Sequence, residues 1–517
     1  MASETLAIID LGTNTFHLII VKIDERDDFS IQEKYKIPVK LGEGGITSGK
    51  ISPASYERGL YAMKRFRKMI DSQKASRVFA FATSAIRSAE NGAQFVKDVK
   101  KQARIDIKVI NGNEEAALIF EGVKNGVQLP YEQDVLILDI GGGSVEFVVA
   151  RENRPLLMRS LDIGAARLLE IVGGSDPMKK SDLERIHSYL HSKMDELIKE
   201  LRLFKIDLLV GSSGSFETLA SIIAHANKDY LSAENLNSYE FGAVAFNKLH
   251  KRLVKSSRSE RLNIPGMEAM RVDMIVMASL IIDILVRELG IRNISTSLFA
   301  LKEGILYHYI AEKKERLNYL IGNTERSLRA KAIRNLGTKF GVDENHGMKV
   351  SEIATRIFQQ LMPLHPLGKN EAEILKYACL LHDIGHFVNR SGHHKHGQYI
   401  IMNSGLNGFS NDELIILGNV VRYHRKSLPT RDHFHYKVLR DRHRYMVRLL
   451  AGILRIADNL DRGHRNIVLD VHVEISNKRI TLDVISKEPA DIEIASASAQ
   501  TQMLSIVLEM EILIRQA

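Results

Sequence analysis

The chain has 517 residues, a net charge of +9 and a single cysteine, Cys379. Its length predicts three or four domains. The lone cysteine excludes an internal disulfide and suits a reducing compartment. No apolar run is long enough to cross a bilayer and no export signal is visible, so we predict a cytoplasmic protein without membrane association. The excess of Lys and Arg favours a polyanionic partner, although a solvated basic surface has the same composition.

The first 127 residues alternate between strand and helix patterns. The predicted strands are residues 5–23, 28–40, 77–83 and 107–112, and the predicted helices are residues 52–73 and 113–127. Ser52 is placed to cap the first of these helices, with Pro53 at its first helical position. Alternation of this kind is typical of an α/β domain.

A second α/β region begins near Asp134, and the pattern changes to almost continuous helix from Glu312. The second region contains a predicted hairpin at 135–150, a helix near 181–203, a strand at 206–215 and further helices to about residue 309. Two period-two segments after about residue 466 predict a final hairpin. We predict four domains: an α/β lobe at 1–126, a second lobe at 127–309, a helical domain at 310–465 and a small C-terminal α/β segment at 466–517.

One plan occurs twice in the α/β regions. "AIIDLGTNTFHLII" (7–20) and "VLILDIGGGSVEFVVA" (135–150) each run from an apolar strand through an aspartate into a turn of small residues and back into a strand. Such self-similarity predicts a duplicated unit. Asp10 and Asp139 end the first strands, and hard oxygen ligands of this kind suit Mg²⁺, bound directly or through water. Glu146 is a third candidate ligand.

The turns themselves are candidate anion sites. Glycine lets the backbone come close to a ligand, and successive amide N–H groups can hold phosphate oxygens. "GSSGS" (211–215) follows another apolar strand and is a third such loop. Tight glycine turns without a ligand would explain any one loop, but three loops with two matching carboxylates favour phosphate binding. The candidate phosphate-binding residues are Gly12, Thr13, Asn14, Gly141, Gly142, Gly143, Ser144, Gly211, Ser212, Ser213, Gly214 and Ser215.

Four ordered motifs resemble those of the exopolyphosphatase/guanosine pentaphosphate phosphohydrolase (Ppx/GppA) family. They are "DLGTNT" (10–15), "ATSAIR" (82–87), "GNEEA" (112–116) and "DIGGGSVE" (139–146). "LFALKEGILY" (298–307) is similar to the closing helix of the family, with Lys302 in place of the usual arginine. The resemblance implies two lobes of the actin-like (ribonuclease H-like, ASKHA) fold followed by a helical domain. It also implies that Glu115 is the catalytic base, whereas Glu114 fits better as an acid that satisfies the helix start.

Phosphoanhydride hydrolysis accounts for these residues. The negative oxygens of the substrate repel nucleophiles, so an enzyme must neutralise them and aim a water molecule in line. Arg87 is predicted to clamp phosphate bidentately, and Mg²⁺ to offset the remaining charge. The predicted activity is release of terminal orthophosphate from inorganic polyphosphate, and the alternative is removal of the 5′ γ-phosphate of guanosine pentaphosphate. A kinase or ATPase also suits the actin-like fold, but the "NEEA" and "ATSAIR" motifs favour the phosphatase branch. No nucleic-acid partner is expected.

Histidines gather between residues 346 and 464. Four of these residues in order resemble the H…HD…D pattern of HD metal-phosphohydrolases, with two further histidines placed to hold a second ion. The candidate ligands are His346, His382, Asp383, His396, His424 and Asp458. In the Ppx/GppA family such residues are often degraded in this domain. The adjacent segment His393, His394 and Lys395 is an alternative basic contact for a long polyanion.

Two rival functions and a homodimer complete the predictions. One rival is an HD-domain hydrolase acting on nucleotides, with the front lobes as a regulatory region. The other is a noncatalytic sensor of polyphosphate or of a guanosine alarmone. A homodimer is predicted because long helical tails often pair.

Overall fold

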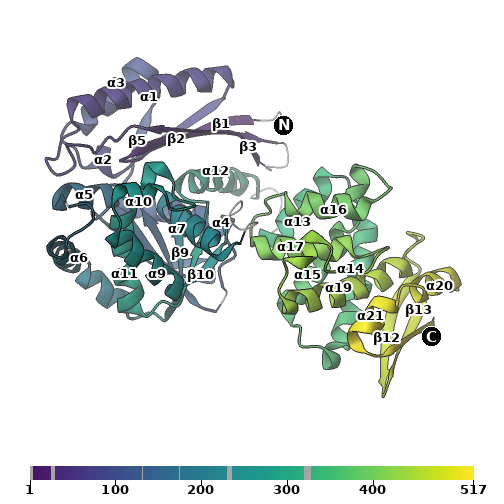
Figure 1. Ribbon diagram of the computed structural model, residues 1–517. Helices are drawn as coiled ribbons and strands as arrows, with labels where there is room; N and C mark the ends of the chain where they lie inside the picture. Colours follow the sequence, from purple (N-terminus) through teal and green to yellow (C-terminus); the bar gives the residue numbers. More distant parts are fainter. Residues whose placement is uncertain (1–3, 25–28, 131, 174, 230–235, 319–327) are drawn as a thin grey trace. The chain divides into compact units, whose positions relative to one another are not determined.

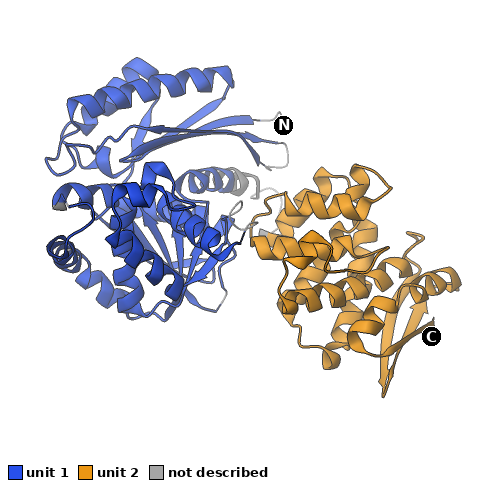
Figure 2. Cartoon of the chain, viewed as in Figure 1, with its two compact units in different colours: residues 1–324 blue, residues 325–517 orange. Residues whose placement is uncertain are grey.

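The computed structural model describes residues 4–24, 29–130, 132–173, 175–229, 236–318 and 328–517 (Figure 1). The chain divides into two compact units, residues 1–324 and 325–517 (Figure 2). The predicted boundaries at residues 126 and 465 stay predictions. The helix α12 (Leu301–Asn318) continues through the predicted boundary at residue 309, and residues 319–327 of the predicted helical run lie outside the described residues.

Unit 1 begins with a five-stranded sheet in the order β3-β2-β1-β4-β5. Its strands are β1 (Glu4–Leu11), β2 (Thr15–Ile23), β3 (Phe29–Pro38), β4 (Arg77–Ala82) and β5 (Ile107–Val109). The helices after β3 and β4 are α1 (Pro53–Ser72), α2 (Ser84–Arg87) and α3 (Gly92–Ala103). The predicted cap of α1 is confirmed, because the Ser52 side chain accepts a hydrogen bond from the Ser55 backbone N–H. Side chains of α1 and α3 share one apolar core with this sheet.

A six-stranded sheet follows in the order β10-β11-β9-β6-β7-β8. Its strands are β6 (Asp134–Ile140), β7 (Val145–Arg151), β8 (Arg154–Leu161), β9 (Ile206–Ser212), β10 (Glu240–Gly242) and β11 (Asn293–Thr296). In both sheets two antiparallel pairings are followed by two parallel ones, so β8-β7-β6-β9-β11 repeats the plan of β3-β2-β1-β4-β5. The predicted duplication is therefore present in the topology.

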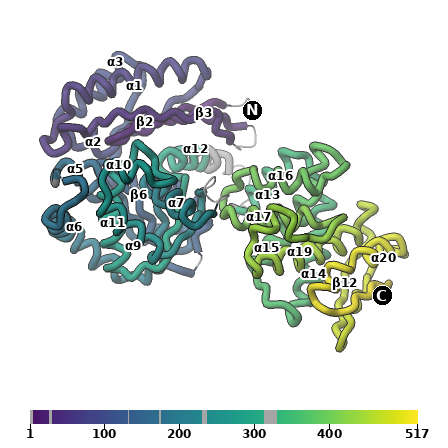
Figure 3. The backbone as a smooth tube through the Cα atoms, in the orientation of Figure 1, coloured from purple at the N-terminus to yellow at the C-terminus, as the bar shows by residue number. Residues whose placement is uncertain are grey.

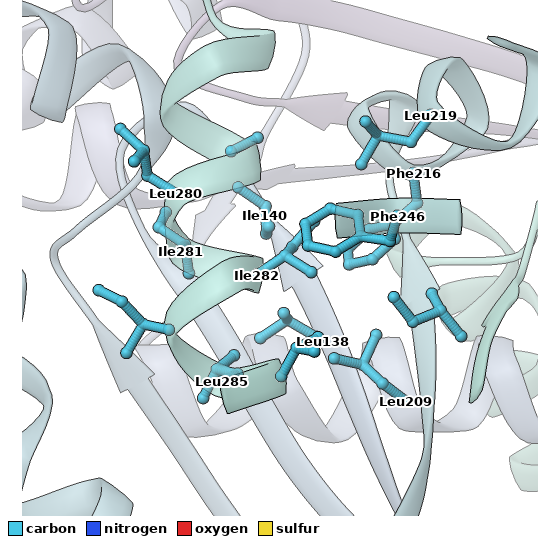
Figure 4. Packing of buried hydrophobic residues seen from close by; sticks show 14 of the residues in the cluster. Leu138, Ile140, Leu209, Phe216, Leu219, Phe246, Leu280, Ile281, Ile282 and Leu285 are labelled. Carbon is cyan, nitrogen blue, oxygen red and sulfur yellow. The ribbon is translucent and has the colours of Figure 1, made fainter. Parts of the chain in front are cut away.

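The helices of the second half cover this sheet. They are α5 (Ala165–Val172), α6 (Lys180–Leu201), α7 (Gly214–Asn227), α9 (Ala243–Lys255), α10 (Arg258–Leu262) and α11 (Ile275–Leu289). Figure 4 shows Leu138 of β6, Leu209 of β9 and Ile282 of α11 in one apolar core. Burial on nearly every side explains why α11 is mostly apolar from Ile275 to Val286, with Asp283 as the charged exception. Among the described residues, no helix is both long and apolar enough to cross a membrane.

Two helices form a layer between the sheets. α4 (Gly112–Gly126) and α12 contribute to one core with residues of both sheets, among them Ile8 and Ile137. The helices approach very closely, because a Cβ on Gly304 would lie only 1.7 Å from the Leu118 carbonyl oxygen. This packing fixes the start of α4 and the start of α12 near the ends of β1 and β6.

Unit 2 is a helical domain with a small sheet, and its backbone can be followed in Figure 3. Its helices are α13 (Leu328–Lys339), α14 (Glu344–Gln360), α15 (Lys369–Leu381), α16 (His393–Met402), α17 (Asn411–Arg422), α18 (Phe434–Lys437), α19 (Asp441–Leu460), α20 (Asp491–Ser498) and α21 (Gln502–Leu508). The predicted final hairpin is confirmed as β12 (Val468–Ser476) and β13 (Arg479–Ser486). A third strand, β14 (Glu511–Gln516), pairs in parallel with β13.

Candidate active site

The two hairpins that carry the repeated motif match in register. Asp10 lies opposite His17 in the β1–β2 pair, and Asp139 lies opposite Glu146 in the β6–β7 pair. The turns also close alike: a Cβ on Gly12 would lie 3.0 Å from the Thr15 carbonyl oxygen, and one on Gly141 would lie 3.0 Å from that of Ser144. The two aspartates therefore occupy equivalent places in the two lobes.

Both turns open into one cavity of about 380 Å³. Most of the predicted site residues line it: Asp10, Gly12, Thr13, Asn14, Glu115, Asp139, Gly141, Gly142, Gly143, Ser144, Ser213 and Gly214. The lining does not include Arg87, Glu146, Gly211, Ser212 and Ser215. Residues far apart in the sequence thus meet as the duplicated plan predicts, and their individual roles stay predictions.

The loop tips of the two lobes touch at Gly143. A Cβ at this position would lie 2.5 Å from Ser84 Oγ and 2.7 Å from Thr13 Oγ1, both in the first lobe. The Gly143 carbonyl accepts hydrogen bonds from the Gly164 backbone N–H and from Arg167 Nε, at 3.1 and 3.0 Å. The absence of a side chain at Gly143 therefore lets the first lobe close against this loop.

Replacing Gly143 with alanine is expected to separate the loops and to destabilise the fold. Overpacking of this kind costs roughly 1–3 kcal/mol of unfolding free energy. Gly242→Ala is the matched control, since a Cβ there would meet only the Arg292 carbonyl oxygen at 3.9 Å. Thermal melts would be measured for both variants. Equal behaviour of the two variants would contradict the close contact.

The third glycine loop supports the second hairpin. Ser212 Oγ donates to Asp139 Oδ2 at 2.6 Å, so this serine orients the aspartate. A Cβ on Gly214 would lie 2.3 Å from the Arg271 guanidinium, which packs over this glycine. Ser213 precedes α7, and its buried Oγ has no hydrogen-bond partner among the described residues. Ser213 and Gly214 are therefore the members of this loop that are placed to meet a ligand.

Four acids gather around the cavity: Glu115 and Glu146 are buried, and Asp10 and Asp139 are half-buried. Burial raises the pKa of Asp10 to about 6 and that of Glu115 to about 7, the latter against the lowering effect of Arg87. Burial also raises the pKa of Asp139, and burial together with the charges of Glu115 and Asp139 raises that of Glu146 well above its usual value. A bound cation would relieve this repulsion, so the donor set fits Mg²⁺. In the described part of the chain, the compact groups of three possible metal ligands all lie in unit 2. The acids at the unit 1 cavity therefore suit a cation that is held partly through water molecules.

Comparison with known proteins agrees with this arrangement. The model of the Ppx/GppA phosphatase family matches residues 19–313, and that of Ppx/GppA phosphatase, domain III, matches residues 328–494. The chain belongs to the Ppx/GppA phosphatase family. An exopolyphosphatase from Cytophaga hutchinsonii is 37% identical over 60% of this chain and 98% of its own, with a TM-score of 0.57. A Ppx/GppA family member from Aquifex aeolicus is 25% identical over 60% and 99% of the two chains, with a TM-score of 0.51.

The predicted actin-like fold of the two lobes agrees with these Ppx/GppA neighbours. The C-terminal region is matched by the family's own domain III, and its likeness to HD hydrolases stays a prediction.

The adjacent glutamates of the Ppx/GppA motif "GNEEA" have different surroundings. Glu114 Oε2 accepts a hydrogen bond from the Asn111 backbone N–H at 2.9 Å and completes a capping box, as expected for a helix-start acid. Glu115 is 7% exposed, and Arg87 Nη1 donates to its Oε2 at 2.9 Å and to the Ile110 carbonyl at 3.0 Å. Arg87 is thus placed to position Glu115, and the predicted phosphate clamp by Arg87 stays a prediction.

Two cations at the cavity were not among the predicted site residues. Burial lowers the pKa of Lys302, but the nearby acids, Glu303 and Asp10 foremost, raise it by more, so that this amine stays charged. Arg271 Nε lies 3.6 Å from Glu268 Oε2 and has no hydrogen bond to any described residue. Lys302 lies in the closing-helix motif of the Ppx/GppA family, so the sequence could have identified it as a site residue. Arg271 lies outside every quoted motif, so no sequence signal identified it as a site residue.

In unit 2, five of the six predicted metal ligands come together. His346, His382 and Asp383 form one compact group of possible ligands, and Asp383, His393 and His424 form a second. His346 Nε2 and His382 Nε2 each lie 3.4 Å from Asp458 Oδ1. His396 belongs to neither group of ligand atoms. It lies one turn along α16 from His393. His393 is the first residue of this helix, is buried, and belongs to the second group of ligand atoms.

Proposed function

We propose that this Ppx/GppA phosphatase is an exopolyphosphatase, which releases terminal orthophosphate from inorganic polyphosphate with Mg²⁺ as cofactor. The observation that carries the proposal is the single cavity into which both glycine turns, the buried Glu115 and the cations Lys302 and Arg271 face. The 37% identical relative from Cytophaga hutchinsonii is itself described as an exopolyphosphatase.

The geometry supplies what hydrolysis of a phosphoanhydride requires. The amides of the two turns and the cations Lys302 and Arg271 hold the phosphoryl oxygens and offset their charge. Glu115 accepts a proton from water as the water oxygen attacks the terminal phosphorus. The bond from this phosphorus to the bridging oxygen breaks, which leaves orthophosphate and a chain one phosphoryl group shorter. Mg²⁺, held by Asp10 and Asp139 with Glu146 behind them, would neutralise phosphoryl oxygens when bound.

The pKa of Glu115 predicts the pH dependence of this reaction. Because burial raises that pKa to about 7, the carboxyl group is protonated below this pH and cannot accept a proton from water. We expect kcat/KM to fall about tenfold for each pH unit below neutrality and to level off above it. A pH–rate profile for phosphate release from pH 5 to 9 measures this. A profile that stays flat down to pH 5 would show that Glu115 is not the base.

The lining of the cavity favours polyphosphate over guanosine pentaphosphate. It adds Lys34 and Lys36 to the cations already named, and Tyr35 is the one Phe or Tyr among the described lining residues. A long polyanion needs a series of cationic contacts, whereas a guanine base needs a stacking surface. Removal of the 5′ γ-phosphate of guanosine pentaphosphate remains the second candidate.

The test is phosphate release from long-chain polyphosphate and from guanosine pentaphosphate, measured side by side. The proposal predicts a higher kcat/KM for polyphosphate and loss of both activities in Glu115→Gln. A higher kcat/KM for the nucleotide would overturn the substrate assignment but not the site. Activity that disappears in Asp383→Ala and persists in Glu115→Gln would instead favour the HD-type hydrolase, and tight binding without any release would favour a sensor. The homodimer and the cytoplasmic location stay predictions.

A further inference from the structure

Unit 2 contains a buried cluster of histidines and aspartates that the proposed activity does not use. Six side chains meet from the start of α14, the end of α15, the start of α16, the end of α17 and the end of α19: His346, His382, Asp383, His393, His424 and Asp458. The ligand atoms of five of them, all except Asp458, form two groups, in each of which all atoms lie within 4.8 Å of one another. One group contains His346, His382 and Asp383, and the other contains Asp383, His393 and His424. None of these residues lines the cavity of unit 1.

The imidazole rings of the first group are oriented as metal ligands. His382 Nδ1 lies 2.7 Å from the Cys379 carbonyl oxygen, and His346 Nδ1 lies 2.9 Å from Asp461 Oδ2. Donation through Nδ1 leaves each Nε2 with a lone pair that points into the cluster. His346 and His382 are 3% and 2% exposed, yet neither Nε2 has a hydrogen-bond partner among the residues that the structure describes. Both Nε2 atoms face Asp458 Oδ1 at 3.4 Å, so a cation among them would satisfy all three groups.

The second group brings two further imidazole nitrogens close together. His424 Nδ1 lies 2.6 Å from the Val421 carbonyl oxygen, and His393 Nδ1 lies 3.1 Å from that of Arg390. The Nε2 atoms of these two rings face each other at 3.2 Å. Two imidazoles that both donate through Nδ1 would oppose their lone pairs at this distance unless a positive charge lay between them.

Asp383 connects the two groups. Its Oδ1 lies 3.2 Å from His393 Nε2, and its Oδ2 lies 3.7 Å from His382 Nε2. One oxygen therefore faces each group, which is the arrangement of a bridging carboxylate. The Asp383 side chain is 21% exposed and that of Asp458 is 24% exposed, so the cluster is open on its carboxylate side. The exposed Arg425 lies there, with Nη1 3.3 Å from both ring nitrogens of His393.

We propose that unit 2 binds two divalent transition-metal ions bridged by Asp383, and that a phosphoryl oxyanion is their open-side ligand. His346, His382 and Asp458 complete the first ion site, and His393 and His424 complete the second. Mixed imidazole and carboxylate donors suit ions such as Mn²⁺, Fe²⁺ or Zn²⁺ rather than Mg²⁺. Arg425 supplies a guanidinium that can pair with an oxyanion bound to the ions. The proposal is independent of the exopolyphosphatase activity of unit 1.

The test counts metal ions in the full-length protein. The chain would be loaded with Mn²⁺ in excess Mg²⁺, desalted and analysed by mass spectrometry for Mn per chain. We expect about two Mn²⁺ in the wild type, about one in His424→Ala, and almost none in Asp383→Ala or Asp383→Asn. His396→Ala is the matched control and should keep both ions. Circular dichroism checks that each variant is folded.

The bridge and the oxyanion have readouts of their own. Electron paramagnetic resonance should show an exchange-coupled Mn²⁺ pair, and inorganic phosphate should change that spectrum in the wild type but less in Arg425→Ala. A wild-type protein with one ion or none would overturn the two-ion site. Equal metal loss in His396→Ala and His424→Ala would overturn the assignment of ligands. A spectrum unaffected by phosphate would overturn the oxyanion ligand.

Discussion

Glu115→Gln is expected to lower kcat for phosphate release by about 10²–10⁴-fold, the usual contribution of a general base. Glutamine keeps the size of the side chain and an oxygen that can accept from Arg87 Nη1, but it cannot take a proton from water. The phosphate-binding turns are unchanged, so KM for polyphosphate should stay within a few-fold of the wild-type value. Steady-state phosphate release over a range of polyphosphate concentrations separates the two parameters.

Glu114→Gln is the matched control for this prediction. It makes the same chemical change one residue away, at a side chain that caps α4 and does not line the cavity. Glutamine also completes a capping box, so both stability and kcat should remain close to the wild-type values. If the two variants lost activity equally, the effect would belong to the helix start and not to a catalytic base.

Lys302→Met is expected to lower kcat/KM by about 10²–10³-fold, as for removal of one preorganised electrostatic partner of the transition state. The Lys302 amine lies among Asp10, Glu303, Glu217 and Asp139, and their charges raise its pKa. Methionine removes this positive charge and leaves the acids facing an anionic substrate. Initial rates at polyphosphate concentrations well below KM, in excess Mg²⁺, measure the loss.

The matched control is Lys302→Arg, which restores the residue usual in the family motif. Arginine keeps the positive charge, so this variant should retain activity within about tenfold of the wild type, the difference reflecting its larger head group. Loss in Lys302→Arg as large as in Lys302→Met would mean that the position supplies packing at the start of α12 and not charge. Thermal melts of both variants distinguish a destabilised fold from a weakened site.

The hairpins could be predicted because their pattern is local. Alternating apolar residues, a strand-ending aspartate and a glycine turn recur within 16 residues, and the register of Asp10 with His17 and of Asp139 with Glu146 follows from them. The cap at Ser52 is local in the same way, whereas the cap at Asn111 lies in a segment that was predicted as a strand. That both turns face one cavity followed from the duplication, because equivalent turns of two related lobes lie at equivalent places.

Features that depend on tertiary contacts were missed. β8 has exposed arginines because it is an edge strand, and β10 and β11 have only 3 and 4 residues, so neither shows a clear period. Arg271 reaches the cavity from a short 3₁₀ turn that carries no motif. His393 and His396 look alike in the sequence, and only the packing of α16 against the cluster decides which of them faces the other ligands.

The central claim is that one turn from each lobe grips the same phosphate chain. A crystal structure of Glu115→Gln with Mg²⁺ and a short polyphosphate tests it most directly, because this variant binds substrate without consuming it. We predict phosphoryl groups between residues 12–14 and 141–144, with the terminal phosphorus next to residue 115. A polyphosphate bound elsewhere in the chain, with no phosphoryl group between these two turns, would contradict it.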